Sequence, residues 1–111
     1  MKDTLYRGQQ VLITDAVKYA SDAVVSKTLI KREAGTLTLF AFDKGQALSE
    51  HTAPFEAAVL ILDGTAEIII GGESHTLKSG EFIIMPADIP HAVKAKDKFK
   101  MLLMMIKEKK S

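Results

Sequence analysis

Turn-forming residues recur at short intervals along this 111-residue chain, and their spacing constrains the fold more than any other feature. Between them lie short runs rich in valine, isoleucine, leucine, phenylalanine and threonine. Many short apolar runs with regular glycine and proline punctuation are typical of an all-β sandwich or barrel, so we expect an all-β fold. The turn signals are Gly35, Gly45, Asp63-Gly64, Gly71-Gly72, Gly80, Pro86 and Pro90.

The dipeptide Asp63-Gly64 separates two apolar runs, 57–62 and 65–70, by two residues. This spacing predicts a β-hairpin with a type I′ turn. The pair of glycines that follows residue 70 predicts the next turn, which leads into a polar segment. We interpret His75, within that segment, as an exposed hairpin residue.

Two runs, 58–62 and 101–106, are apolar without alternation. Strands there should be buried on both faces, either between sheets or under a second subunit. A helix competes for residues 99–110, because methionine, leucine and lysine favour helices. The β pattern upstream favours a strand over 99–106 instead.

The chain has 15 basic and 14 acidic residues, which gives a formal net charge of +1. This balance provides no strong field for nucleic acid or an anionic membrane, and we expect neither partner. The basic segment 107–110 is interpreted as a solvated terminus. There is no cysteine, which excludes disulfides, thiolate catalysis and cysteine-bound zinc. Because residues 1–10 lack the core of a signal peptide, and no apolar run approaches the ~20 residues of a membrane span, a cytoplasmic protein is predicted.

Two stretches place glycine, histidine and proline at fixed intervals. The positions concerned are Gly45, His51 and Gly64 in the first stretch and Gly80, Pro86 and His91 in the second. The two stretches resemble the two motifs of the cupin family, roughly G-x5-H-x-H-x3-4-E-x6-G and G-x5-P-x-G-x2-H-x3-N. The six positions, and the gap between the motifs, fall in register, and the resemblance covers about residues 35–106.

This resemblance implies a small double-stranded β-helix, or jelly-roll barrel, with a pocket inside. We expect one such domain over 1–111, with its recognisable barrel core at 35–106 and an N-terminal arm at 1–22. Within the arm a single helical turn, capped by Thr14 or Asp15, is predicted. Family habit, together with the strands that are apolar on both faces, implies a homodimer.

The chain departs from the family at four motif positions. Alanine replaces the second histidine, the glutamate and the asparagine, and aspartate replaces a glycine; the positions are Ala53, Ala57, Ala95 and Asp88 in that order. Residues two apart on a strand share a face, so positions 51, 53 and 57 should face the barrel interior, with His91 across the barrel.

Two histidines make a poor metal site. Zinc usually takes three or four protein ligands, and the open iron site takes two histidines and a carboxylate. Glu56 would join His51 and His91 as a carboxylate ligand only if a β-bulge turned it inward. We therefore favour a protein without a cofactor, and keep a divalent transition metal held by these three residues as an alternative.

The alanines at these motif positions leave space for a ligand. We expect a largely apolar interior pocket that binds a small organic molecule, oriented by His51 and His91. Burial and a second nearby imidazolium disfavour the charged form, so at least one histidine should accept a proton near neutral pH. One alternative is a metal-free acid–base enzyme, such as an isomerase, epimerase or cyclase, and another is a metal-dependent, oxygenase-like enzyme. The predicted lining residues are Ala53, Ala57, Phe40, Phe42 and Met85.

Overall fold

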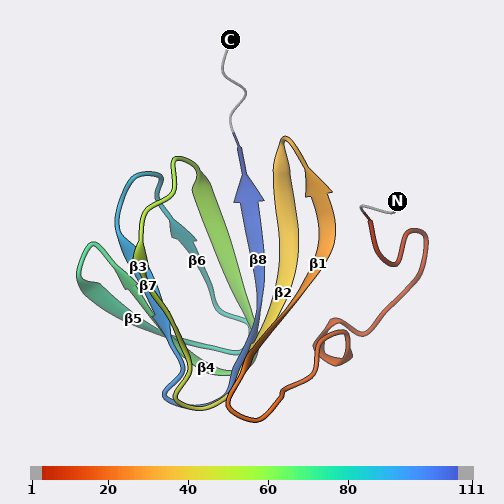
Figure 1. Cartoon of the computed structure of the whole chain (residues 1–111), viewed down its shortest axis with the longest axis horizontal. Helices are drawn as coiled ribbons and strands as arrows, with labels where there is room; N and C mark the ends of the chain where they lie inside the picture. Colours follow the sequence, from red (N-terminus) through yellow and green to blue (C-terminus); the bar gives the residue numbers. More distant parts are fainter. Residues whose placement is uncertain (1–3, 108–111) are drawn as a thin grey trace.

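The computed structural model describes residues 4–107 of the chain, and in them it confirms an all-β fold (Figure 1). The strands are β1 (Val24–Arg32), β2 (Gly35–Phe42), β3 (Ala47–His51), β4 (Glu56–Ile70), β5 (Glu73–Lys78), β6 (Phe82–Met85), β7 (His91–Lys94) and β8 (Phe99–Ile106). The predicted strand over 99–106 is confirmed, and its helical alternative is wrong. Of the basic segment 107–110, all but the first residue lies outside the described residues. No helix in 4–107 is long and apolar enough to cross a membrane.

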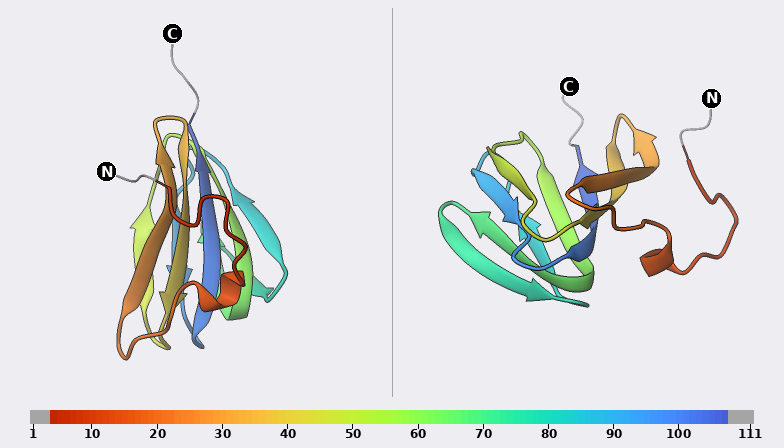
Figure 2. Two further views of the ribbon diagram at one scale, coloured as in Figure 1. Left: turned by 90° about the vertical axis from the view of Figure 1, so that its right-hand side faces the viewer. Right: turned by 60° about the horizontal axis from the view of Figure 1, so that its bottom comes forward.

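The strands form two antiparallel walls that share one long strand, β4. The larger wall has the order β1-β2-β8-β4, with β6 on the other side of β4. The smaller wall contains the second half of β4 between β5 and β7, and β3 pairs with β7 at its edge. The walls meet at the bend of β4 and diverge from it, so the barrel is open at one end (Figures 1 and 2).

The predicted hairpin at Asp63-Gly64 is wrong, because β4 continues through it. Ile61 lies opposite Met101 and Asp63 opposite Lys100, so one extra residue forms a bulge in the strand. Gly64 has a φ of +74°, and a β-carbon there would lie 2.1 Å from the carbonyl oxygen of Lys98. The dipeptide therefore bends the strand without reversing it, and passes the chain from the larger wall to the smaller.

The predicted turn at Gly71-Gly72 is confirmed. Ile70 pairs with Glu73 across it, so the loop has two residues. Both glycines have a positive φ, +57° and +82°, which a type I′ turn requires. The helical turn predicted in the arm is a 3-10 turn over Ile13–Asp15. Its predicted caps are wrong, since both lie inside the turn, whose N-cap residue makes no side-chain hydrogen bond.

Two apolar clusters hold the molecule together. The larger fills the space between the walls, and at its base the rings of Phe42 and Phe99 stack with centroids 4.6 Å apart. The smaller joins Ala16 and Val17 of the arm to Leu39 and neighbouring side chains on the outer face of the larger wall. The arm crosses that face in Figure 2.

Candidate functional site

The course of β4 defines the open end of the barrel. Ala57 precedes the bend at Gly64 by seven residues, and Ile70 follows it by six. At a rise of ~3.3 Å per residue, both lie about 20 Å from the bend, one on each wall. The two ends of the strand therefore bring two rows of side chains to the open end of the barrel. We call this region the mouth.

One row of the mouth belongs to each wall. On the larger wall Ala57 lies between Met85 of β6 and Met105 of β8. On the smaller wall Ile70 pairs with His91, and His91 pairs with His51. The two histidines that the sequence singled out are therefore neighbours on adjacent strands. They were expected on strands across the barrel from each other.

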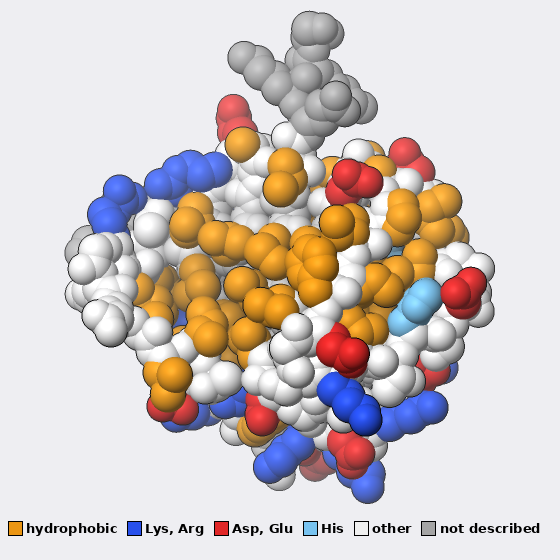
Figure 3. All heavy atoms as spheres, turned by 180° about the vertical axis from the view of Figure 1, so that it is seen from behind, with side chains coloured by type: hydrophobic (Ala, Val, Ile, Leu, Met, Phe, Trp, Pro, Cys, Tyr) orange, Lys and Arg blue, Asp and Glu red, His pale blue; other side chains and the backbone are white. Residues whose placement is uncertain are grey.

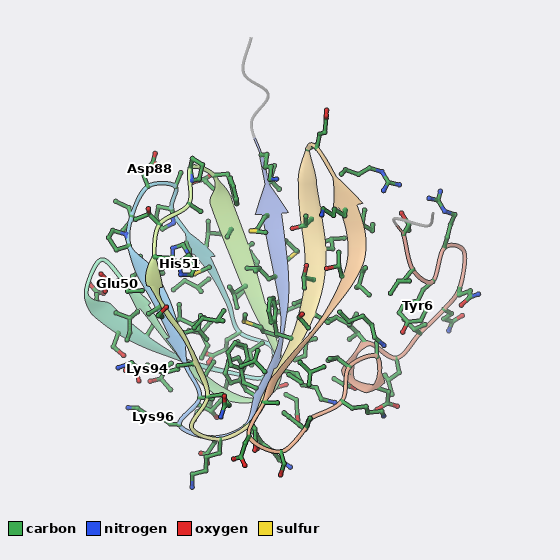
Figure 4. All side chains as sticks on the ribbon, viewed as in Figure 1. Tyr6, Glu50, His51, Asp88, Lys94 and Lys96 are labelled. Atoms are coloured by element: carbon green, nitrogen blue, oxygen red, sulfur yellow. The ribbon has the colours of Figure 1, made fainter. Side chains whose placement is uncertain are left out.

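The two histidine rings are in contact. Their Nε2 atoms are 3.1 Å apart, with ring centroids at 4.4 Å and an interplanar angle of 69°. His91 is buried, with 5% of its surface exposed, whereas His51 is exposed. Figure 4 shows His51 pointing from β3 into the space between the walls, with Glu50 on the other side of the strand. The pair thus forms a polar edge of the mouth that solvent can reach.

Backbone carbonyls hold the far side of each ring. The Nδ1 of His51 is 2.8 Å from the carbonyl oxygen of Ser49, and the Nδ1 of His91 is 3.2 Å from that of Ile89. A carbonyl oxygen only accepts, so each Nδ1 is placed to donate a proton. The Nε2 atoms are then left facing each other, and one of them must also carry a proton to make a hydrogen bond.

These contacts require more protons than a neutral pair has. Two carbonyl bonds and one Nε2–Nε2 bond need three protons, and two neutral imidazoles carry two. Burial lowers the pKa of His91 below its ordinary value; the carbonyl of Ile89 opposes this shift, and the charge of His51 adds to it. Burial therefore favours the neutral form of His91, and a third proton on the pair would complete its bonds and add one positive charge.

The predicted lining residues lie at different depths. Ala57 and Met85 are buried in the mouth row of the larger wall, and Ala53 is half-buried in the loop before β4. Phe40 is half-buried two rows deeper, and Phe42 is fully buried at the base. Ala57 and Met85 thus lie in the row of the core cluster at the open end of the barrel, whereas Phe42 packs at its base.

Three residues of the mouth were not among the predicted lining residues. Ile70 and Met105 are members of its two rows, and Thr36 extends the row beyond Met105. The Thr36 hydroxyl is buried without a hydrogen-bond partner. Counting outward from Gly64 in both directions would have identified Ile70, but only if β4 had been recognised as one continuous strand.

The described side chains do not fit a resident transition metal with three or four protein ligands. Glu56 lies on the outer face of the larger wall, where it lines a hollow with Ala58 and Ile84. In residues 4–107, no three His, Cys, Asp or Glu side chains are grouped so that they could hold a metal ion. Two imidazoles alone fall short of the usual ligand count, and no chemical step is assigned to a metal here.

A family model described as the cupin domain matches residues 38–107, more than half of the chain. The chain therefore belongs to the cupin family. This confirms the resemblance seen in the two motifs, and the jelly-roll class of fold that it implied.

Similar solved structures agree with this membership. A conserved protein of unknown function from Streptococcus pyogenes is 39% identical, with a TM-score of 0.88 over 92% of this chain and 90% of that chain. A cupin 2 conserved barrel domain protein from Leptotrichia buccalis is 38% identical, with a TM-score of 0.82 over 85% of this chain and 46% of that chain. A cupin superfamily protein from Desulfitobacterium hafniense is 24% identical and supports the fold alone, with a TM-score of 0.88 over 96% of this chain and 97% of that chain. No curated protein matches the chain.

Proposed function

We propose that the protein binds a small organic acid in the mouth of its barrel. The carboxylate lies against the Nε2 edge of His51 and His91, and the apolar body lies against Ala57, Met85 and Met105. The pairing of the two Nε2 atoms carries this proposal, because the three hydrogen bonds of the pair need one more proton than two neutral imidazoles hold.

A bound anion would make the uptake of the third proton favourable. A positive charge at a partly buried pair is costly unless an opposite charge accompanies it. A carboxylate at the Nε2 edge would provide that charge and raise the pKa of His91, so the pair would take up its proton as the acid binds. The favoured guest is therefore an anion and not a neutral molecule of the same shape.

The opposite wall favours an apolar body on that anion. Ala57 and Met85 are buried, and Met105 packs against the same apolar cluster. Ligand sites in proteins are mostly apolar and use a few polar groups for orientation. Methionine side chains are adaptable, which suits a planar or branched hydrocarbon group.

Isothermal titration calorimetry with benzoate and benzamide tests the proposal, since the two differ mainly in charge. We expect benzoate to bind at least about tenfold more tightly than benzamide, because the neutral amide does not compensate the positive charge of the protonated pair. His91→Gln and His51→Gln should each remove this preference, whereas His75→Gln, on the β5 hairpin strand, should keep it. Equal binding of the two probes, no binding of benzoate at millimolar concentration, or a preference that survives both mouth variants would contradict the proposal.

Proton uptake gives a second measurement. Binding of benzoate near pH 7.5 should take up a proton, up to one for each anion bound, because burial favours the neutral form of His91 in the free protein and the bound anion favours its charged form. The binding heat should then differ between buffers of different ionisation enthalpy, and the affinity should fall as the pH rises. A binding heat that is the same in all buffers would show that no proton accompanies the anion.

Proton transfer is a second candidate function. Both Nδ1 atoms are held by carbonyls, so the Nε2 atoms are the ones placed to exchange a proton with a bound acid. Tyr6 and Tyr19, which pack with the arm cluster, are not available as partners. Acids that bind can be incubated in D2O with the protein, and deuterium incorporation on carbon that His51→Ala abolishes would establish this activity. No incorporation above the rate without protein would exclude it for those acids.

Elemental analysis checks the metal-dependent alternative. Protein purified without chelators should hold less than about a tenth of an equivalent of zinc, iron, manganese, nickel or copper, because two imidazoles are too few protein ligands. A full equivalent that is lost in His51→Gln would replace the proposal with a metal site completed by water or by the organic acid.

A further inference from the structure

Thr36 is a polar residue on the inner face of the larger wall. It pairs with Met105 on β8, and residues directly opposite each other on adjacent strands share a face. Met105 packs against the apolar cluster between the walls, so the side chain of Thr36 also faces the space between the walls. The outer face of the same wall is different in character, with hydrophobic side chains gathered across it in Figure 3 and few charged side chains among them.

The order of the strands places β2 opposite β3 across the mouth. At the base of the barrel, β2 runs into β3 through residues 43–46, and β7 runs into β8 through residues 95–98. Two hydrogen bonds join these loops, because the N–H of Gly45 donates to the carbonyl of Ala95 and the N–H of Ala95 donates to that of Gln46. The order β2-β8-β4 in the larger wall therefore faces the order β3-β7-β4 in the smaller wall.

This order sets the two rows of the mouth against each other, residue by residue. Met105 on β8 lies opposite His91 on β7, and Thr36 on β2 lies opposite His51 on β3. Toward β6 the row of the larger wall is apolar, and in the other direction it ends at Lys31, an exposed residue on β1. Thr36 therefore provides the hydroxyl that faces the histidine edge of the mouth.

The hydroxyl of Thr36 is buried and has no hydrogen-bond partner in residues 4–107. A buried hydroxyl without a partner is unfavourable for the folded state. Thr38, one row deeper on the same face of β2, differs in this respect, since its hydroxyl lies 3.5 Å from that of Thr28. A change of rotamer turns the Thr36 hydroxyl toward a group bound in the mouth. A ligand there can therefore supply the hydrogen bond that the fold does not.

We infer that Thr36 makes the site selective for 2-hydroxy acids, which carry a hydroxyl on the carbon next to the carboxylate. The inference rests on the proposed function, which places the carboxylate against His51 and His91. Because Thr36 lies opposite His51, the group that reaches it must be close to the carboxylate in the ligand. A hydroxyl on the adjacent carbon meets this condition, and the Thr36 hydroxyl can both donate to it and accept from it.

The same arrangement distinguishes the two enantiomers of such an acid. The carboxylate contacts the histidines, the apolar body lies against Met85 and Met105, and the hydroxyl contacts Thr36 at the other end of the row. Three different contacts around one carbon atom can be made together by one enantiomer only. We therefore expect a preference for one hand of the acid.

Isothermal titration calorimetry with phenylacetate and the two enantiomers of mandelate tests the inference, because mandelate is phenylacetate with a 2-hydroxyl group. One enantiomer should bind about fivefold more tightly than phenylacetate or the other enantiomer, as one added hydrogen bond allows. Thr36→Val should remove both preferences and leave the affinity for phenylacetate unchanged within about twofold. Thr36→Ser, which keeps the hydroxyl, and Thr38→Val, the matched control one row deeper, should both retain them.

Phenylacetate separates this inference from the proposed function, because it has no hydroxyl. If phenylacetate binds no more tightly than phenylacetamide, the proposed function is wrong and the inference is wrong with it. If phenylacetate is preferred over its amide but mandelate gains nothing, or if the gain survives Thr36→Val, the contact with Thr36 is wrong and the acid site remains.

The stability of the protein without ligand gives a second readout. Thr36→Val should raise the midpoint of urea denaturation, because it removes a buried hydroxyl that has no partner in residues 4–107. Thr38→Val should not raise the midpoint, since the hydroxyl that it removes lies beside that of Thr28. A lower midpoint for Thr36→Val would show that this hydroxyl stabilises the fold, and would contradict its role in binding.

Discussion

Asp88 shows how one residue departs from the family motif without changing the backbone. It occupies the motif position of a glycine, and it has a φ of +65°. Aspartate is one of the few residues other than glycine that adopts this left-handed conformation. Its backbone N–H donates to the carbonyl of Ala53, which ties the loop before His91 to the loop after His51. The backbone requirement of the motif is therefore kept, although its glycine is lost.

Substitutions at Asp88 should separate this backbone requirement from any role of the side chain. Asp88→Val should lower the free energy of unfolding by about 1–2 kcal/mol, because a β-branched residue is strained at positive φ. Asp88→Gly should leave the free energy of unfolding nearly unchanged. The glycine removes strain from the folded state, and this offsets the greater conformational freedom that it gives the unfolded chain. Urea denaturation measures both, with Asp97→Val as an exposed control. Equal stability of the valine and glycine variants would contradict this account.

His91 should also make stability depend on pH. Its pKa is lowered by burial, so below about pH 6.5 the unfolded chain binds a proton that the folded chain does not. The free energy of unfolding should therefore fall as the pH drops from 7.5 to 5.5. His91→Gln should flatten this dependence, whereas His75→Gln should preserve it. Denaturant unfolding at the two pH values gives the comparison, and equal slopes in the wild-type and His91→Gln proteins would refute it.

At the scale of the element, β4 is the strand on which the whole site depends. Its first half pairs with β6 and β8, and its second half with β5 and β7. The bend at Gly64 separates the halves, and the backbone of Lys98 and Phe99 passes so close that no side chain fits there. The divergence of the two walls therefore begins at a single glycine.

Gly64→Ala should destabilise the protein more than Gly45→Ala. Both glycines have a positive φ, which costs alanine about 1–3 kcal/mol. Only at Gly64 would the new β-carbon also meet backbone atoms, whereas nothing lies within 4 Å at Gly45. The difference in the free energy of unfolding between the two variants, measured by urea denaturation, gives the cost of the contact between the new β-carbon and the backbone of Lys98 and Phe99. Equal losses would mean that the bend can move to accept a methyl group.

The same strand shows why the local pattern was right about one turn and wrong about the other. Asp63-Gly64 and Gly71-Gly72 both allow positive φ, and only the second reverses the chain. Whether such a pair forms a hairpin depends on which strands lie beside it. At Gly64 the partner is β8, more than thirty residues away in sequence, and a dipeptide pattern contains no information about it.

At the scale of the whole molecule, the family motifs predicted the barrel and identified His51 and His91, but they predicted neither that the two lie on adjacent strands nor what surrounds the pair. The carbonyls that hold the rings belong to the backbone two residues before each histidine, and residue types do not reveal them. Strand parity indicated that Glu56 points away from Ala57, and the structure places it on the outer face. The arm was predicted as a segment, but its docking on the larger wall depends on packing across the fold.

The docking of the arm predicts a further effect on stability. Val17 is buried between the arm and the larger wall, and Lys27 and Lys100 donate hydrogen bonds to the carbonyls of Ala16 and Thr14, just before it in the chain. Val17→Asp should lower the free energy of unfolding by about 2–4 kcal/mol, because it buries an unpaired charge. Lys18→Asp, at an exposed neighbouring position, is the control. Denaturation curves that coincide for the two variants would show that the arm contributes little to folding.

Because β4 runs unbroken through both walls, a change in its bend at residue 64 moves the two walls relative to each other. Each half of β4 is about 20 Å long, so a change of about 5° in the bend shifts the far ends of the two halves by about 2 Å relative to each other. That shift is close to half the thickness of an aromatic ring. The aperture of the barrel is therefore set by the backbone angles of a residue without a side chain, far from every atom that a guest would touch.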